Sequence, residues 1–269
     1  MSRTRQKLAE TTVRTSTANR GLLYCPRPAI RRGISMSHAP PSYQAIRIRV
    51  AEASVDQTRK GLRTGPERGL RQAQRVIESE IQRLPRDERG PLACRAGCDF
   101  CCHLRVMVTP VEVFALLEYL RQTLDPAAWA DFTEAVTSTD RTLRELPADK
   151  VLTTNLPCPV LAAGQCRGYP ARPLNCRSYH SLSRQACEES FRQPDNLDLG
   201  HPQLTALAKV HEGGQSGFVA ALREAGFDAR QYELVSALAE ALDDPEASTR
   251  FSNREQAFLR PPVVEPGQV

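Results

Sequence analysis

Cysteine is the residue type in this sequence whose number and spacing could do chemistry. Eight of the nine cysteines lie between residues 94 and 187, in two runs. The first run has the spacing Cys-x3-Cys-x2-Cys-Cys, and the second run is more widely spaced. In order, these residues are Cys94, Cys98, Cys101, Cys102, Cys158, Cys166, Cys176 and Cys187. Thiolates are the soft ligands that bind zinc, copper(I) and iron–sulfur clusters. The sequence therefore predicts a metal or iron–sulfur site and leaves any reaction open.

Core packing and disulfide bonding are the alternatives to metal binding. The first run occupies positions i, i+4, i+7 and i+8, which share one face of a helix, so these side chains could be a buried apolar stripe. The cysteines could also pair as disulfides. We find no apolar secretory segment near residue 1, which favours a reducing compartment with free or metal-bound thiols. Unligated neighbouring thiols would also be prone to oxidation. Metal binding is the interpretation that we favour.

The spacing does not decide between an iron–sulfur cluster and Zn²⁺. Zinc sites with four cysteines commonly use two short Cys-x2-Cys knuckles. Here Cys98 and Cys101 form one knuckle, whereas the second run has spacings of 8, 10 and 11 residues. Iron–sulfur ligand runs combine short spacings with a distant cysteine, and one such run ends in Cys-Pro, as in Cys158-Pro159. The number of metal sites is also left open.

Four basic side chains near the cysteines are candidates for supporting such a centre. Arg172 and Arg177 flank Cys176 and could offset the negative charge of metal-bound thiolates. As an alternative, both arginines are exposed on a turn. His103 and His180 could each replace a thiolate as ligand, although we expect a hydrogen-bonded supporting role. The sequence identifies no catalytic residue.

The combined cysteine pattern resembles the YkgJ-type cysteine-cluster family, a zinc- or iron-chelating domain. The resemblance covers about 95 of the 269 residues. It is carried by the first run and then by Cys158-Pro159, Cys166 and Arg172-Pro173-Leu174-Asn175-Cys176-Arg177, with Cys187 trailing. Gly168, before Tyr169, departs from the apolar residue expected there. The resemblance implies metal binding but no particular reaction.

An enzymatic function is the alternative. A flagellin lysine-N-methylase group carries a similar cysteine cluster, which implies a cluster-dependent, protein-modifying enzyme by analogy alone. The spacing of Cys94, Cys98 and Cys101 also matches the three-cysteine pattern of radical S-adenosylmethionine enzymes. Those enzymes are built on βα barrels, and this sequence shows no repeating strands.

Helical periodicity is the main secondary-structure signal outside the cysteine runs. Thr109-Pro110-Val111-Glu112 predicts a helix start with a capping box formed by Thr109 and Glu112. Helices are predicted over about 46–86 with an interruption at Gly65-Pro66, 109–122, 126–146, 202–224 with a soft spot at Gly213-Gly214, 229–242 and 253–258. Residues 147–200 show no regular pattern. The expected fold class is mainly α, with helices surrounding an irregular cysteine-rich metal-binding region.

The two cysteine runs are separated by 55 residues but should meet in space. We expect the helices at 110–122 and 126–146 to form an antiparallel excursion that returns the chain to its starting point. Because residues 147–200 contain few large apolar side chains, metal ligation rather than burial should order them.

Charge and composition limit the classes of partner that the protein could have. Of the net charge of +5, residues 1–50 carry +9 and the remainder −4. The folded part therefore offers no nucleic-acid footprint, and no stretch is long and apolar enough for a membrane span. We expect a cytoplasmic and, from its Arg-, Ala- and Pro-rich composition, bacterial protein. The expected partner is a metal ion or cluster, and no protein partner can be named.

The predicted organisation is a disordered basic tail over 1–45, a single helical domain over 46–260 and a loose tail over 261–269. The basic tail could be a nucleic-acid-binding arm or a transit peptide, but an over-long translation start, with Met36 as the true first residue, is favoured. Cys25 lies in this tail and is left out of the site.

Overall fold

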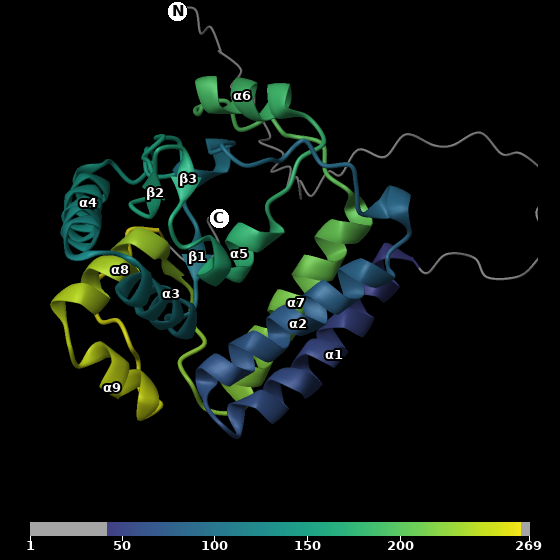
Figure 1. Ribbon diagram of the computed structural model, residues 1–269, viewed down its shortest axis with the longest axis horizontal. Coiled ribbons are helices and arrows are strands. Elements are labelled where there is room, and N and C mark those ends of the chain that lie inside the picture. The colour runs from purple at the N-terminus through teal and green to yellow at the C-terminus, as the bar shows by residue number, and fades with distance from the viewer. Residues whose placement is uncertain (1–41, 265–269) are drawn as a thin grey trace, which may run out of the picture. The chain divides into compact units, whose positions relative to one another are not determined.

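Helices dominate the computed structural model, which describes residues 42–264, and the predicted mainly α class is confirmed (Figure 1). The helices are α1 (Tyr43–Leu62), α2 (Pro66–Arg83), α3 (Pro110–Thr123), α4 (Pro126–Glu145), α5 (Leu174–Ser178), α6 (Arg184–Arg192), α7 (Thr205–Glu224), α8 (Leu234–Asp243) and α9 (Ala247–Ser252). The strands are β1 (Met107–Val108), β2 (Leu161–Ala162), β3 (Gln165–Cys166) and β4 (Tyr232–Glu233). Short 3-10 turns are η1 (Arg86–Glu88), η2 (Phe100–His103) and η3 (Tyr169–Ala171). Residues 1–41, with Cys25 and Met36, lie outside this description.

Helices α1, α2 and α7 pack side by side (Figure 1). Gly213 and Gly217 of α7 allow this approach, because a Cβ atom there would lie 2.4 Å and 2.3 Å from carbonyl oxygens of α1. A Cβ on Gly214 would lie 2.2 Å from Ile77 of α2. The expected soft spot at Gly213-Gly214 is therefore wrong. Helix α7 is continuous there, and the glycines serve close helix packing.

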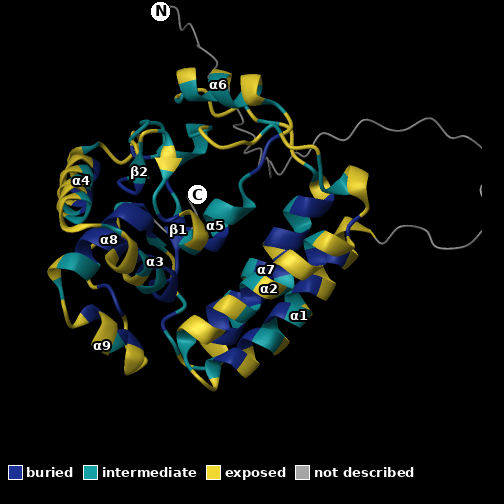
Figure 2. Cartoon of the chain, in the orientation of Figure 1, coloured by how far each residue is buried: buried dark blue, intermediate teal, exposed yellow. Residues whose placement is uncertain are grey.

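Helices α3 and α4 both pack on α8. Buried residues, dark blue in Figure 2, make up half of α3 and most of α8. Phe132, Leu116, Leu120 and Leu238 are among the fully buried side chains here. The predicted capping box at Thr109 and Glu112 is present at the start of α3. The excursion of α3 and α4 is thus held by α8, a helix from much later in the sequence.

Three further sequence predictions differ from the structure. Residues 147–200 are not without regular structure, since they hold the β2–β3 hairpin, α5 and α6. The helix predicted at 229–242 begins only at Leu234, because the preceding residues pair as β4 with β1. The short helix predicted at 253–258 is absent from the described chain, and α9 lies before it. These elements are short, so periodicity carries little signal.

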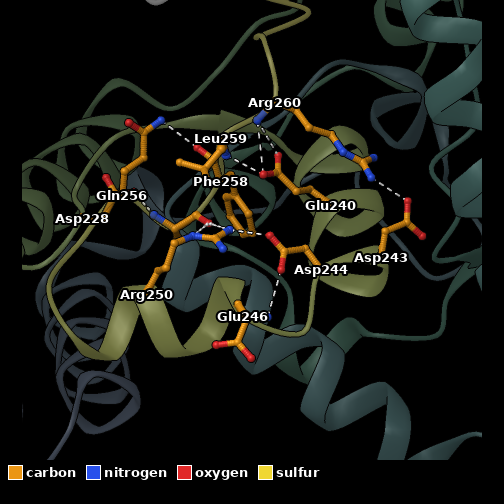
Figure 3. Close-up of polar contacts among 11 residues, drawn as sticks. Asp228, Glu240, Asp243, Asp244, Glu246, Arg250, Gln256, Phe258, Leu259 and Arg260 are labelled. Atoms are coloured by element: carbon orange, nitrogen blue, oxygen red, sulfur yellow. Dashed lines mark hydrogen bonds and ion pairs between the residues drawn. The ribbon is translucent and has the colours of Figure 1, made fainter.

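The segment after α9 is tied to α8 by polar contacts (Figure 3). The Glu240 carboxylate accepts hydrogen bonds from the backbone amides of Leu259 and Arg260. The Arg260 guanidinium also pairs with Asp243 at 2.7 Å. Val264 is buried beside Met107 and Val235. Val264, within the tail expected to be loose from residue 261, is thus packed into the fold, and residues 265–269 lie outside the described residues.

No helix within residues 42–264 combines the length and apolar character needed to cross a bilayer.

Candidate metal centre

The first cysteine run is a sequence of tight turns. Gly97 has φ +80°, a conformation that favours glycine, and the amide of Cys98 bonds the carbonyl of Arg95 at 3.0 Å. Cys101 and Cys102 then lie in η2. This backbone is not α-helical, so the four thiols do not form the buried helical stripe that core packing would require.

The β2–β3 hairpin brings the next two cysteines together. Its two-residue turn uses Ala163 at φ 49° and Gly164 at φ 72°, the positive values that match the twist of paired strands. Cys166 pairs with Leu161 across the hairpin, and the amide of Leu161 bonds the carbonyl of Cys158 at 2.9 Å. The hairpin thus fixes Cys158 and Cys166 relative to each other.

The two cysteine runs meet, as the sequence predicts. The backbone amide of Cys158 donates to the carbonyl oxygen of Cys102 at 2.8 Å. Helices α3 and α4, which lie between the two runs, therefore lead the chain away and back to its starting point. Both helices pack on α8.

Helix α5 presents Cys176 to the same place. Its first amide, at Leu174, donates to the buried Glu112 carboxylate at 2.8 Å. The Asn175 side chain donates to the carbonyl of Met107 in β1 at 2.5 Å. These contacts attach α5 to β1 and to the start of α3, so Cys176 is positioned by a stretch of chain that lies 62 to 68 residues earlier.

Four thiols form what we call the inner set: Cys101, Cys158, Cys166 and Cys176. Burial raises the pKa of Cys158 to about 12, and it also raises the pKa values of Cys166 and Cys176. The other inner thiols raise the pKa of Cys176 further. The hydrogen-bonded side chain of Cys102 raises the pKa of Cys101, with burial adding to the effect. Without metal, these groups stay protonated at neutral pH.

Tyr179 lies near Cys101 of the inner set and near two other cysteines. Burial raises the pKa of its hydroxyl, and nearby Cys101, Cys187 and Cys94 raise it further. Cys94 is exposed, whereas Cys187 is partly buried on α6. Helix α6 is held against η2, where Phe191 packs on Phe100 with ring centroids 5.5 Å apart. The structure therefore brings distant Cys187 close to the first run.

Within residues 42–264, no three side chains of His, Cys, Asp or Glu surround one point closely enough to ligate a single ion as they stand. The inner thiols influence one another electrostatically and are gathered from three segments. Their chemistry, soft sulfur donors removed from water, is that of a zinc or iron ligand set.

The two predicted histidines have different surroundings. His180 is buried, and its Nδ1 lies 2.9 Å from the carbonyl oxygen of Ser178 while its Nε2 accepts from the amide of Leu204 at 3.1 Å. Both ring nitrogens are thus occupied, which disfavours His180 as a ligand. His103 Nδ1 lies 3.2 Å from the Asp99 carbonyl oxygen, and its ring packs edge-on against Phe191.

The predicted arginines also differ. Arg172 stacks on Tyr169 at 4.1 Å, and its charge lowers the pKa values of Cys101 and Cys166 against the larger opposing effects. Arg177 donates to the carbonyls of Arg172 and Pro170, so it mainly braces the loop before α5.

Arg105 is a cation near the cysteines that sequence reasoning missed. Its charge lowers the pKa of Cys158 against the larger effect of burial. Its Nη1 lies 3.8 Å from Glu233, whose pKa burial raises to about 7. The position of Arg105 just after the first run was the available signal, but its burial follows from the β1–β4 pairing.

A cavity of about 1090 Å³ adjoins these residues. Five cysteines contribute to its wall: Cys101, Cys102, Cys158, Cys166 and Cys176. A centre bound by the inner set would therefore face a space large enough for a small molecule.

Comparison with known families agrees with this geometry. Residues 93–196 match the CxxCxxCC family, described as "Putative zinc- or iron-chelating domain". The match contains both cysteine runs, and it supports metal binding in general. No curated protein and no solved structure matches the chain.

Proposed function

We propose, from the premise that residues 93–196 match the CxxCxxCC family of zinc- or iron-chelating domains, that their cysteines hold an iron–sulfur cluster or a zinc ion. The observation that carries this proposal is the convergence of the inner set from both cysteine runs. Cys102 and Cys158 are joined by a backbone hydrogen bond of 2.8 Å, and α5 adds Cys176.

The inner set supplies the ligands in this proposal, while Cys94, Cys98, Cys102 and Cys187 are available for remaining positions or a second site. Because the inner thiols are protonated in the absence of metal, each thiol that ligates must release a proton. Metal uptake should therefore weaken as the pH falls. Arg105 and Arg172 supply positive charge that stabilises the resulting thiolates.

An iron–sulfur cluster is favoured over a single zinc ion by the spacing of the thiols. Four sulfurs around one zinc, each at about 2.3 Å from the metal, must lie close together. The described side chains do not form such a group. A cluster places its own iron and sulfide between the ligands and accepts a wider arrangement. Its role would be electron transfer, metal handling or structural support.

A cluster-dependent, protein-modifying enzyme is the second candidate, as in the methylase analogy. The cavity favours it, because structural metal sites are closed whereas catalytic sites keep an open position. In the described residues, the inner cysteines line a space of about 1090 Å³. A purely structural site would not require such a space.

Anaerobic purification followed by elemental analysis tests the proposal. We expect iron with acid-labile sulfide and a visible absorption band, and zinc without these signals is the alternative metal. Stoichiometry then gives the number of sites. A protein that carries neither metal, and takes up neither after reduction of its thiols, contradicts the proposal.

A further inference from the structure

The cavity beside the cysteines has a second wall that the metal proposal does not use. This wall comes from α7 and from the segment that enters β4, and it includes Val219, Ala220 and Tyr232. The volume of the whole cavity, about 1090 Å³, lies at the upper end for small-molecule sites, which commonly span roughly 300–1,000 Å³. Ligand sites of this kind combine apolar walls with a few polar groups.

The charge of the lining is strongly positive. Five arginines and two glutamates face the cavity, an excess of three positive charges. One of the acids, Glu212, already pairs with Lys209 and with Arg47, the latter at 3.5 Å. The other, Glu233, accepts a hydrogen bond from the amide of Ser236 at 2.9 Å. The two acids are thus used in part by the fold, as is Arg260 in its pair with Asp243. Among the described residues, none of the other four arginines has an ion pair shorter than 3.8 Å, so they are available to a ligand.

Arg105 is the arginine of the lining that is most deeply buried and least satisfied by hydrogen bonds. Only 7 % of this residue is exposed, and its Nη2 donates to the carbonyls of His103 and Leu156 at 2.9 Å and 2.6 Å. Its buried Nε and Nη1 have no hydrogen-bond acceptor among the described residues, and the Glu233 carboxylate lies 3.8 Å from Nη1, beyond hydrogen-bond distance. An unsatisfied buried polar group is costly, and an acceptor from a ligand would remove that cost.

Two further arginines lie at the solvent-exposed part of the lining. Arg223 lies in the last turn of α7, and Arg230 follows it in the loop to β4. Arg230 is more than half exposed and only 4.0 Å from its acidic neighbour Asp228, a loose pair. Exposed arginines at a cavity can attract an anion and hold its oxygens.

We infer that this cavity binds an organic oxyanion: a molecule with an apolar body and a carboxylate or phosphate group. Arg105 receives the oxyanion at the cysteine end, and Arg223 and Arg230 contact the ligand at the opening. The inference goes beyond the metal centre, because the arginine-lined wall does not require a metal to be present.

The test uses the full chain as purified, with 8-anilino-1-naphthalenesulfonate as fluorescent probe. N-phenyl-1-naphthylamine, which has the same rings without the sulfonate, reports binding that needs no charge. The variants are Arg105→Met and the surface double variant Arg223→Gln/Arg230→Gln. The matched control is Arg71→Gln/Arg75→Gln on α2, which removes two exposed arginines away from the cavity.

We expect each cavity variant to weaken sulfonate binding about tenfold or more, with little effect on the neutral probe or in the control. Equal losses in the α2 control, unchanged sulfonate binding in the double variant, or a parallel loss of the neutral probe each overturn the inference. The double variant alters exposed side chains, so its result does not depend on whether Arg105→Met folds.

Competition identifies the oxyanion. Displacement of the probe by octanoate indicates a carboxylate ligand, and displacement by 1-naphthyl phosphate indicates a phosphate ester. Failure of both to compete overturns the inference.

Metal content, measured on the same samples, separates the two proposals. If a protein that carries no metal still binds the sulfonate probe through these arginines, the result contradicts the proposed metal centre but not the inferred oxyanion site. Loss of metal in Arg105→Met with unchanged probe binding means that Arg105 serves the metal, and overturns the inference.

Discussion

The backbone amide of Leu174 donates a hydrogen bond of 2.8 Å to the buried carboxylate of Glu112, 62 residues earlier in the chain. The other carboxylate oxygen accepts from the amide and hydroxyl of Thr109, each at 2.8 Å. A single side chain therefore caps α3 and also fixes the start of α5, the helix that carries Cys176. The fold and the candidate metal centre are joined at this residue.

Replacing Glu112 should damage both stability and metal binding. In Glu112→Ala, the buried amides of Thr109 and Leu174 lose their acceptor, so we expect a loss of about 2–4 kcal/mol in unfolding free energy. Cys176 should also become less well positioned, which would lower metal retention against a chelator. Thr109→Ala is the control, because it leaves the Leu174 bond in place. It should cost about 1 kcal/mol and retain the metal. Equal metal loss in both variants would contradict the positioning role.

The same residue shows what sequence could and could not predict. Thr109, Pro110 and Glu112 lie within one helical turn, so their local spacing was enough to predict the capping box. The bond to Leu174 depends on tertiary packing, which no local pattern contains. Helix α6 was missed because Cys187 and Phe191 are nearly its only large apolar side chains. The β2–β3 turn was missed because Ala-Gly is a weaker hairpin signal than Asn-Gly. The cysteine spacing could be recognised in the sequence, whereas the burial of Arg105 could not.

Loss of an inner thiol should release the metal and loosen residues 147–200. We expect Cys176→Ser to lose metal and to become sensitive to limited proteolysis within this segment. Most helical circular dichroism should persist, since α1, α2 and α7 pack through their own apolar faces. Cys25→Ser, outside the proposed site, should behave like the wild type. A segment that stays protease-resistant without metal would show that the cysteines act as packing or disulfide partners.

The buried His211 should make stability depend on pH. It is 7 % exposed, and burial lowers its pKa from 6.5 to about 4, with His180, Arg172 and Arg177 nearby adding to the effect. The unfolded chain therefore takes up a proton more readily. The contribution of neutral His211 to the stability of the folded protein is fully present above about pH 6.5, and it is lost as the pH falls towards 4.

His211→Gln removes this titration. Relative to its value at pH 8, the unfolding free energy of the wild type should fall more steeply with acid than that of the variant. The difference at low pH should be on the order of 3 kcal/mol. Denaturant unfolding at several pH values, at equal metal loading, measures it. Parallel pH profiles for the two proteins would contradict the assigned pKa shift.

The turn of the β2–β3 hairpin offers a test of how backbone conformation controls metal binding. Gly164 has φ 72°, and a Cβ built there meets nothing within 4 Å, so Gly164→Ala introduces backbone strain without a clash. We expect it to cost about 1–2 kcal/mol and to lower metal retention, because the hairpin aligns Cys158 and Cys166. Gly200→Ala is the matched control, since its Cβ also meets nothing and its φ is not in the positive range.

The reverse change should strengthen the hairpin. Ala163 has φ 49°, a conformation that Asn adopts more readily, and Ala163→Asn creates the favoured Asn-Gly turn. We expect a gain of about 0.5–1 kcal/mol and slower loss of metal to a chelator. The two substitutions thus move metal retention in opposite directions through neighbouring residues that carry no ligand. If Gly164→Ala and Gly200→Ala lose metal equally, or if Ala163→Asn releases metal faster than the wild type, the hairpin does not set the geometry of Cys158 and Cys166.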